Sequence, residues 1–322
     1  MEMIASAAIS FVITAALLKI FIPILKKAKL GQRILEIGPN WHKSKEGTPT
    51  MGGLFFMIGI IIAACVMCIK EMKMEGIRLL ILVLFALCNG LIGFVDDYVK
   101  LFKKRNKGLS ALEKMFLQLA LTAVFLCAMS FYGYLTSEIT IPLVGTKLDL
   151  GVFTYVIYLL GIVFFINGAN FTDGIDGLAG SVNLVILVMF LIMGIRQDEL
   201  VLSVLSSSAI GGVLGFLVFN FHPAKVFMGD TGSLFLGGLV VSLCFAFDCP
   251  LVLPIMGFVH IFEAISVVLQ VLYFKMTGKR LFKMAPIHHH FEKCGWSEVK
   301  IVGVFSFVTA ILCAASYALT VL

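Results

Sequence analysis

Apolar segments of about 20 residues recur along the whole chain, and they constrain its fold more than any other feature. A segment of this length matches an α-helix that crosses the hydrocarbon core of a bilayer. Because lipid offers the backbone no hydrogen-bond partner, spanning segments are helices or closed barrels, and the alternating strands of a barrel are absent here. The sequence therefore predicts an all-α polytopic membrane protein with a single domain over residues 1–322.

The composition excludes several other classes of protein. Apolar residues make up 60% of the chain and charged residues only 14%, which excludes an ordinary soluble domain and a disordered chain. The net charge of +6 is not arranged as a basic stripe with interleaved aromatic residues, so we expect no nucleic-acid partner. The eight cysteines are scattered, mostly within apolar segments, and are best explained as small apolar residues.

Ten spans are expected, with one interruption and one outer hairpin. They lie at about residues 4–25, 51–69, 78–95, 115–135, 152–168, 178–195, 201–219, 233–247, 251–273 and 299–321. The ninth span contains Pro254 and Gly257, which predict a kink or a break. Between the fourth and fifth spans, residues 136–150 alternate around Gly145 and predict a small β-hairpin on the outer surface.

The basic residues predict which side of the membrane each loop occupies. Nineteen of the 25 Lys and Arg residues fall in loops on one side, and five fall on the other. The basic loops are 26–50, 96–114, 220–232 and 274–300. Because cytoplasmic loops are enriched in Lys and Arg, this side is expected to face the cytoplasm. An even number of spans then places both termini outside.

Five of the eight aspartates, Asp96, Asp97, Asp173, Asp176 and Asp230, lie at the ends of spans on this cytoplasmic side. Ionisable residues at membrane depth are costly, and a cluster from several loops indicates a functional site. Neighbouring residues of a helix point about 100° apart, so the adjacent pair is not expected to chelate one ion together. Instead, one of the two carboxylates would face the site.

Two further segments add ligands suited to metal ions and phosphates. In the segment 167–180, Asn170, Asp173 and Asp176 recur at every third position and share one face if that segment is helical. Their oxygens suit Mg²⁺ and sugar hydroxyls. The segment Gly229–Ser233 opens a span, where exposed N–H groups favour a phosphate and an aspartate could hold a bridging cation.

Histidines and lysines on the same side complete the set. The three histidines His288, His289 and His290 are consecutive, so their side chains diverge, and hydrogen bonding to a phosphate or carboxylate is favoured over a zinc site. Lys45 precedes a Gly-Thr-Pro-Thr turn and is either a topology signal or a substrate contact. Together these residues favour phosphoryl transfer between a soluble anionic donor and a lipid acceptor, catalysed by positioning and charge neutralisation.

The motifs GTPTMGG, GFVDDYVK, NFTDGIDGLAG, FMGDTGSL and PIHHHFE, in this order, resemble the phospho-N-acetylmuramoyl-pentapeptide transferase family. The resemblance covers essentially the whole chain. The aspartate motifs alone are shared with the wider superfamily of polyprenyl-phosphate N-acetylhexosamine-1-phosphate transferases, and the histidine segment points to this branch. The resemblance implies a fold of ten transmembrane helices, typically a homodimer, in the bacterial cytoplasmic membrane with its active site facing the cytoplasm.

The resemblance also implies a reaction and a set of site residues. UDP-N-acetylmuramoyl-pentapeptide and undecaprenyl phosphate would give lipid I and UMP, with Mg²⁺ as cofactor. Asp96, Asp97 and Asp230 match the catalytic positions; Asp96 would handle the lipid phosphate, and Asp230 with Asn170 would hold Mg²⁺. The implied substrate-binding residues are Lys45, Lys100, Asn170, Asp173, Asp176, Asn220, Phe227, Gly229, Gln270, His288, His289 and His290.

Several alternatives stay open from the sequence. A sibling enzyme would use UDP-N-acetylglucosamine as donor, although the histidine segment argues against it. A transporter for an anionic solute would also carry membrane carboxylates, but its polar residues would gather near the midplane rather than at one face. Within the transferase interpretation, direct attack by the lipid phosphate and a two-step route through a phospho-aspartate are both compatible with these residues.

Overall fold

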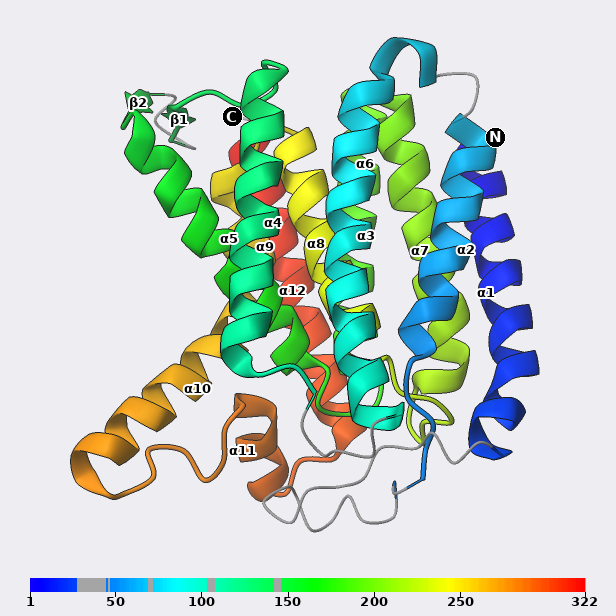
Figure 1. The fold of residues 1–322 in the computed structure, drawn as a ribbon, viewed down its shortest axis with the longest axis vertical. Helices are drawn as coiled ribbons and strands as arrows, with labels where there is room; N and C mark the ends of the chain where they lie inside the picture. Colours follow the sequence, from blue (N-terminus) through cyan, green and yellow to red (C-terminus); the bar gives the residue numbers. More distant parts are fainter. Residues whose placement is uncertain (28–44, 46, 69–71, 103–107, 142–145, 322) are drawn as a thin grey trace.

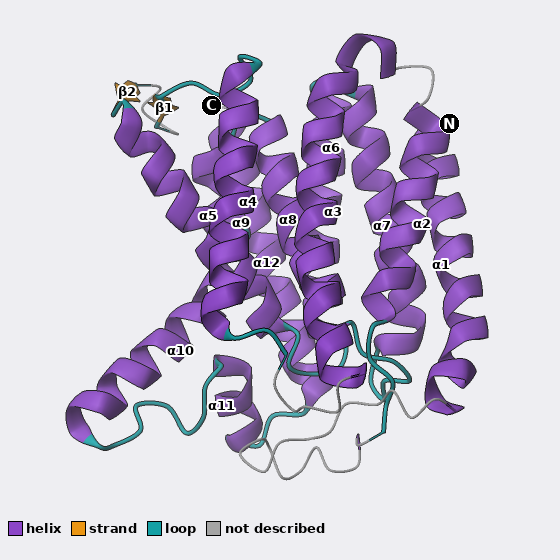
Figure 2. Ribbon diagram, in the orientation of Figure 1, coloured by secondary structure: helices purple, strands orange, loops and turns teal. Residues whose placement is uncertain are grey.

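The computed structural model describes residues 1–27, 45, 47–68, 72–102, 108–141 and 146–321. Long helices run side by side as a bundle, and one helix, α10, points away from it near one end (Figure 1). Helix dominates the described residues, and the two short strands lie at the end opposite α10 and α11 (Figure 2). Much of the first two predicted basic loops, at 28–44 and 103–107, lies outside the described residues.

The bundle is built from helices of very different length. The elements are α1 (Glu2–Lys27), α2 (Gly52–Cys68), α3 (Met72–Phe102), α4 (Ala111–Phe131), β1 (Glu138–Thr140), β2 (Lys147–Asp149), α5 (Val152–Thr172), α6 (Leu178–Arg196), α7 (Leu200–Asn220), α8 (Gly229–Ala246), η2 (Pro250–Val252), α9 (Leu253–Met256), α10 (Phe258–Thr277), α11 (Ile287–Lys293) and α12 (Glu298–Val321).

The predicted spans are recovered within the described part of the chain. Nine helices there are long and apolar enough to cross a membrane, and α2 is a tenth, shorter apolar helix. Both chain ends lie at the end of the bundle that carries the hairpin, whereas the loops bearing the aspartates lie at the opposite end (Figure 1). The all-α polytopic fold predicted from the apolar segments is confirmed.

The ninth span is broken, as its glycine and proline predicted. The chain forms η2 and α9, turns at Gly257 and continues as α10. A Cβ atom added at Gly257 would lie 2.1 Å from a ring carbon of Phe165, so the break also needs a residue without a side chain. Pro254 lies within the first turn of α9, where proline is tolerated, and so the break falls at the glycine.

The hairpin forms where it was predicted, and three helices differ from expectation. Strands β1 and β2 pair antiparallel, with Ile139 opposite Leu148. Helix α3 continues to Phe102, so the paired aspartates are helical, and α8 begins at Gly229 rather than within its apolar run. Helix α11 forms in the histidine segment, which is too short and too polar for its helix to be predicted from periodicity.

Helix α8 lies at the centre of the packing, with 89% of its residues buried. Glycines allow its neighbours to approach closely, as is common between membrane helices. A Cβ atom at Gly93 of α3 would lie 2.2 Å from the carbonyl oxygen of Asp230, and one at Gly53 of α2 would lie 2.3 Å from Gly232. The start of α8 is therefore fixed between α2 and α3 at the aspartate-bearing end.

This packing gives a stability prediction. Gly93→Ala forces α3 away from the start of α8, and we expect it to lower the free energy of unfolding by about 1–3 kcal/mol, as overpacking of a close contact does. Thermal unfolding in detergent measures the effect. Gly161→Ala is the matched control, because a Cβ atom on that α5 glycine would meet no described atom within 4 Å. Equal unfolding temperatures for the two variants would contradict this account.

Candidate active site

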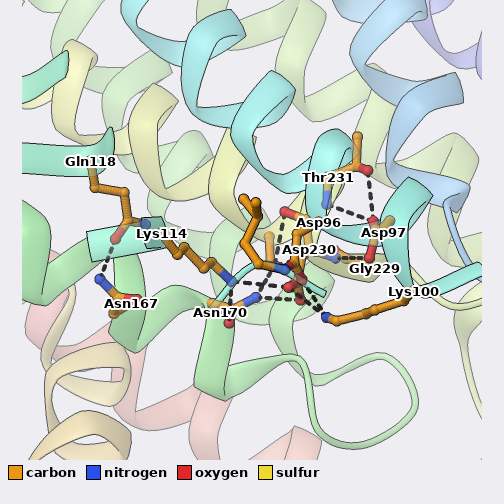
Figure 3. A network of polar contacts seen from close by, with 12 residues as sticks. Asp96, Asp97, Lys100, Lys114, Gln118, Asn167, Asn170, Gly229, Asp230 and Thr231 are labelled. Carbon is orange, nitrogen blue, oxygen red and sulfur yellow. Dashed lines mark hydrogen bonds and ion pairs between the residues drawn. The ribbon is translucent and has the colours of Figure 1, made fainter. Parts of the chain in front are cut away.

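The carboxylate of Asp97 fixes the first turn of α8 (Figure 3). Its Oδ2 accepts hydrogen bonds from the Thr231 N–H at 2.9 Å and from the Thr231 hydroxyl at 2.7 Å. Its Oδ1 accepts from the Asp230 N–H at 3.2 Å. The unpaired N–H groups at a helix start carry partial positive charge, so a carboxylate from the neighbouring helix stabilises them. Asp97 thereby holds Asp230 in place.

Asp230 is the point at which four helices meet. Its Oδ2 lies 2.9 Å from the Nζ atoms of both Lys100, on α3, and Lys114, on α4. Its Oδ1 accepts a hydrogen bond of 3.0 Å from the amide of Asn170, on α5. The same amide nitrogen donates to the Ser233 hydroxyl, one turn into α8, at 2.8 Å. One carboxylate therefore gathers two cations and an amide from α3, α4 and α5.

Asp96 links this cluster to the segment before α4. Its Oδ2 lies 2.5 Å from the Lys100 Nζ, and its Oδ1 accepts a hydrogen bond of 2.7 Å from the Leu109 N–H. A Cβ atom at Gly108 would lie 2.3 Å from Asp96 Oδ1, so the backbone passes directly over the carboxylate. Asp96 is almost fully buried, with 2% of its surface exposed, and Lys100 supplies its counter-charge.

The three carboxylates fit a small hard cation. One oxygen from each of Asp96, Asp97 and Asp230 lies within 4.8 Å of the other two. Both oxygens of Asp97 already accept hydrogen bonds from the start of α8, so the expectation that the adjacent aspartates do not chelate one ion together stays a prediction. Oxygen ligands of this kind suit Mg²⁺ or Ca²⁺. The Asn170 amide donates its nitrogen to Asp230, so it would have to turn over to become a ligand.

A second polar cluster surrounds Lys45. Its Nζ lies 2.7 Å from Asp176 Oδ1 and 2.7 Å from Glu298 Oε2, at the start of α12. Glu298 also accepts the Asp176 N–H at 2.9 Å, and His222 Nδ1 lies 3.2 Å from Asp176 Oδ2. Asp176, His222 and Glu298 also have the ligand spacing of a metal site, with the Lys45 ammonium paired to Asp176 and Glu298. The cluster ties the segment before α2 to three other loops.

Asp173 lies between the two clusters. It follows the last residue of α5 and comes within electrostatic range of both Asp230 and Asp176. Although part of the residue is exposed, burial of the carboxyl, followed by the charges of Asp230 and Asp97, raises the pKa of Asp173 well above its usual value. This carboxyl therefore keeps its proton to higher pH than an exposed aspartate and can donate a hydrogen bond.

The remaining predicted residues on the α7–α8 connection shape the backbone. The Asn220 amide accepts from the Gly177 N–H at 3.1 Å and donates to the Val226 carbonyl at 2.9 Å, joining two loops. The Phe227 carbonyl accepts from the Gly52 N–H at 2.9 Å. Gly229 has a φ of 74°, and a Cβ atom there would lie 2.6 Å from Asp97 Oδ2, so no larger residue fits.

The predicted residues of α10 and α11 fix the connection between these two helices. Gln270 accepts the Phe282 N–H at 2.8 Å, and His290 Nδ1 accepts the Lys283 N–H at 3.1 Å. His289 Nδ1 lies 2.5 Å from Glu292 Oε2. His288 is fully buried. None of these contacts joins the aspartate cluster directly.

Three site residues were not predicted: Lys114, His222 and Glu298. Lys114 lies in the first turn of α4. In the sequence it counts only among the basic residues of the loop 96–114. Glu298 begins α12 after the histidine segment and has no motif partner in sequence. A signal for Lys114 existed, since a lysine that begins an apolar span on the side of the aspartates is well placed to pair with them.

Comparison with known proteins agrees with this geometry. The model of Glycosyl transferase family 4 matches residues 79–248, and phospho-N-acetylmuramoyl-pentapeptide-transferase signature 1 matches residues 45–57. The phospho-N-acetylmuramoyl-pentapeptide-transferase of Clostridium botulinum (strain Alaska E43 / Type E3) is 44% identical over 309 residues, covering 95% of this chain and 93% of the relative. The chain belongs to the phospho-N-acetylmuramoyl-pentapeptide-transferase family.

Other transferases of this family match over nearly the same length. The one from Clostridium beijerinckii (strain ATCC 51743 / NCIMB 8052) is 43% identical, covering 98% of this chain and 96% of the relative. The one from Bacillus thuringiensis (strain Al Hakam) is 41% identical, covering 96% of both chains. The transferase signature includes Lys45 and the close glycine contact of α2, and the family 4 match contains all three clustered aspartates.

The Asp97 contacts predict a stability effect that precedes any catalytic one. Asp97→Asn removes the negative charge at the start of α8 and replaces one accepting oxygen by an NH₂ group. We expect the free energy of unfolding to fall by about 1–3 kcal/mol, the usual cost of leaving buried hydrogen-bonding groups unpaired. Thermal unfolding of the protein in detergent, without substrates, measures it.

The control for that variant is Asp149→Asn. Asp149 also accepts a backbone hydrogen bond, from the Gly151 N–H at 2.8 Å, but it lies at the exposed hairpin. Its substitution is expected to leave the unfolding temperature near that of the wild type. If Asp97→Asn behaved like Asp149→Asn, the aspartate could not be what holds the start of α8.

Proposed function

We propose that this chain transfers phospho-N-acetylmuramoyl-pentapeptide from UDP-N-acetylmuramoyl-pentapeptide to undecaprenyl phosphate, giving lipid I and UMP in peptidoglycan synthesis. The observation that carries the proposal is the cluster of Asp96, Asp97 and Asp230 with two lysines at one end of a membrane bundle. Carboxylates that can hold a cation, beside two lysine ammonium groups, are what two phosphate-bearing substrates need. The names of the relatives supply the transferred group, phospho-N-acetylmuramoyl-pentapeptide, and the family resemblance supplies the donor and the acceptor.

Magnesium is the cation that we assign to the three carboxylates. Asp230 would be its principal ligand, with Asp96 or the turned-over amide of Asn170 completing the protein's share. When bound, Mg²⁺ would supply positive charge to the diphosphate and so favour departure of UMP. The fit rests on the hard oxygen donors and on their common reach of 4.8 Å.

The cations of the cluster would bind the phosphates. Lys100 is 41% exposed, so its ammonium can contact a substrate while it neutralises Asp96 and Asp230. Lys114 approaches the same carboxylate from α4. Asp97 and Thr231 keep the start of α8 in position and need not touch a substrate, whereas Asp96 would orient the lipid phosphate.

The donor would lie between Asp230 and α11, along the α5–α6 and α7–α8 connections. Phe227 and Gly229 would contact the uracil, and Asn220 and Gln270 would define the nucleotide side. Asp173 and Asp176 offer a hydrogen-bond donor and a carboxylate acceptor for sugar or phosphate groups. Lys45 would contact the donor from the second cluster. The histidines His289 and His290, with His288 buried behind them, would border the same side.

The simplest chemistry is direct displacement. An oxygen of undecaprenyl phosphate attacks the β-phosphorus of the donor, and the bond from that phosphorus to the UMP oxygen breaks. A phosphate monoester has a second pKa of about 6, so the attacking group is already largely dianionic at neutral pH. The side chains therefore mainly hold the reactants in line and neutralise charge, without a required general base.

The cellular arrangement follows from the charge bias of the loops. We place the protein in the bacterial cytoplasmic membrane as a multi-pass domain of residues 1–322, with the aspartate-bearing end in the cytoplasm and both termini outside. Nineteen Lys and Arg residues lie in loops on the aspartate side, against five opposite. The family resemblance further supports a homodimer.

Release of UMP tests the proposed reaction. Purified protein in detergent, supplied with UDP-N-acetylmuramoyl-pentapeptide, a polyprenyl phosphate and Mg²⁺, is expected to release UMP. Chelation of the metal should abolish release, and Asp230→Asn should lower the rate at least about 100-fold, because charge stabilisation of a transition state is worth several kcal/mol. Asp198→Asn, in an outer loop, is the charge-matched control.

The donor specificity decides between the competing assignments. UMP formed only from UDP-N-acetylglucosamine would assign the chain to the sibling reaction. No turnover of either donor by a folded sample would favour the transporter interpretation.

Exchange of labelled UMP tests direct displacement. Without the lipid phosphate, direct displacement allows no return of label from UMP into the donor, because nothing has yet replaced UMP on the β-phosphorus. We therefore expect no exchange unless the lipid is present, measured by chromatography of the donor. Lipid-independent exchange would instead establish a covalent phospho-aspartate.

A further inference from the structure

Among the residues that the structure describes, helix α10 is buried against the bundle through its first turns. Its buried residues are Val259, His260, Glu263, Ala264 and Ser266, and every residue from 271 to 281 is exposed. The chain then returns and forms α11, whose buried residues are Ile287, His288 and His289. The orientation of this returning segment therefore depends on the hydrogen bond from the Phe282 N–H to Gln270, on packing of Phe291 against Phe305 of α12, and on contacts close to Glu263.

One of those contacts is a buried pair of ionisable side chains. His288 Nδ1 lies 3.1 Å from Glu263 Oε1, and both side chains have no exposed surface. Within the described residues, the Glu263 carboxylate has no other ion-pair or hydrogen-bond partner. A carboxylate that is withdrawn from solvent is costly unless it is paired, so each of the two residues fixes the other.

The other side of the His288 ring rests on the loop between α5 and α6. A Cβ atom at Gly174 would lie 2.2 Å from His288 Nε2 and 2.5 Å from Cε1. Gly174 directly follows Asp173 and precedes Asp176 by two residues. The imidazole thus occupies the space that a side chain would need, and it carries the position of α11 to the loop that bears both aspartates.

His288 also contacts its neighbour on α11. The rings of His288 and His289 lie 4.1 Å apart between centroids, at an interplanar angle of 60°. His289 is held from its other side by Glu292, at 2.5 Å. A shift of the His288 ring would therefore move His289 and the Asp173 loop together.

We propose that the buried Glu263–His288 pair positions the donor-binding half of the site. His288 is a positioning residue, because its ring is fully buried and acts through Gly174 on one side and His289 on the other. Its pairing with Glu263 determines where α11 packs against the loop that bears Asp173 and Asp176. The assignment of this half to the donor rests on the proposed function, whereas the packing position of α11 is independent of that function.

The inference predicts which kinetic constant changes. Loss of the pair loosens contacts to the donor but leaves the cluster of Asp96, Asp97 and Asp230 intact. The KM for the donor should therefore rise, while kcat and the KM for the lipid phosphate stay nearly constant, since the lost interactions bind the ground state and transition state alike. A general loss of structure would change all three constants.

The test compares four variants of the full-length protein. Glu263→Leu removes the ion-pair partner of His288, and Glu263→Gln keeps a polar oxygen at that position without the charge. Gly174→Ala moves the ring directly and leaves both charges in place. Ser266→Ala is the matched control, because this buried hydroxyl donates its hydrogen bond within its own helix, to the Glu263 carbonyl.

We expect Glu263→Leu and Gly174→Ala to raise the donor KM about ten-fold or more, with kcat changed less than about three-fold. Glu263→Gln should restore most of the affinity, and Ser266→Ala should match the wild type. Hydrogen exchange of the α11 amides, measured by mass spectrometry without substrates, should be at least about ten-fold faster in the first two variants.

The two readouts separate the failure of this proposal from the failure of the proposed function. Unchanged exchange in α11 in folded Glu263→Leu and Gly174→Ala proteins would overturn the positioning role, whatever reaction the protein catalyses. Faster exchange accompanied by a lower kcat and by higher KM values for both substrates would mean that the pair contributes only to general stability. That result would also overturn the positioning role. If Glu263→Leu does not fold, the Gly174→Ala result decides by the same criteria. A wild type that releases no UMP overturns the proposed function and leaves the exchange result standing.

Discussion

The contact between the Asp97 carboxylate and the start of α8 is the interaction on which the site depends. It supplies acceptors to two backbone N–H groups and one hydroxyl that have no partner within their own helix. The contact fixes where α8 begins, and Asp230 follows as its second residue. Gly93 then brings the α3 backbone close enough for the carboxylate to reach. This one capping contact thus positions Asp230, which Lys100, Lys114 and Asn170 all contact.

The arrangement of charge explains how so many acids can lie at the end of a membrane bundle. Three of the carboxylates are shared between distant segments of the chain: Asp230 with two lysines, Asp176 with Lys45 and His222, and Glu263 with His288. A buried charge without such a partner would favour unfolding or loss of the charge. Since the partners come from distant segments, every pair also joins two elements, and the polar end is held together by the same groups that would serve the chemistry.

The sequence predicted the spans and the kinds of ligand, but it did not predict their pairing. Spans and the break at Gly257 follow from local properties, because apolar length and a helix-breaking residue act where they occur. The convergence of Asp96, Asp173 and Asp230 followed from charge bias and the order of the spans. The roles of Glu263 and Glu298 could not be predicted, since an isolated acid in or beside an apolar helix has no signature until its partner is seen. The same holds for Asp97, whose helix cap is 134 residues away.

That separation in the chain has a consequence for biogenesis. When α3 enters the membrane, α8 has not yet been synthesised, so Asp97 has none of its native hydrogen bonds. Asp96, one residue earlier, already has Lys100 one turn away as a partner on the same helix. The end of α3 must therefore remain hydrated at the membrane surface until α4 to α7 have been inserted and α8 emerges. Assembly of the site is a late event in translation, and a ribosome that stalls before Gly229 leaves Asp97 without the helix start that it caps in the folded protein.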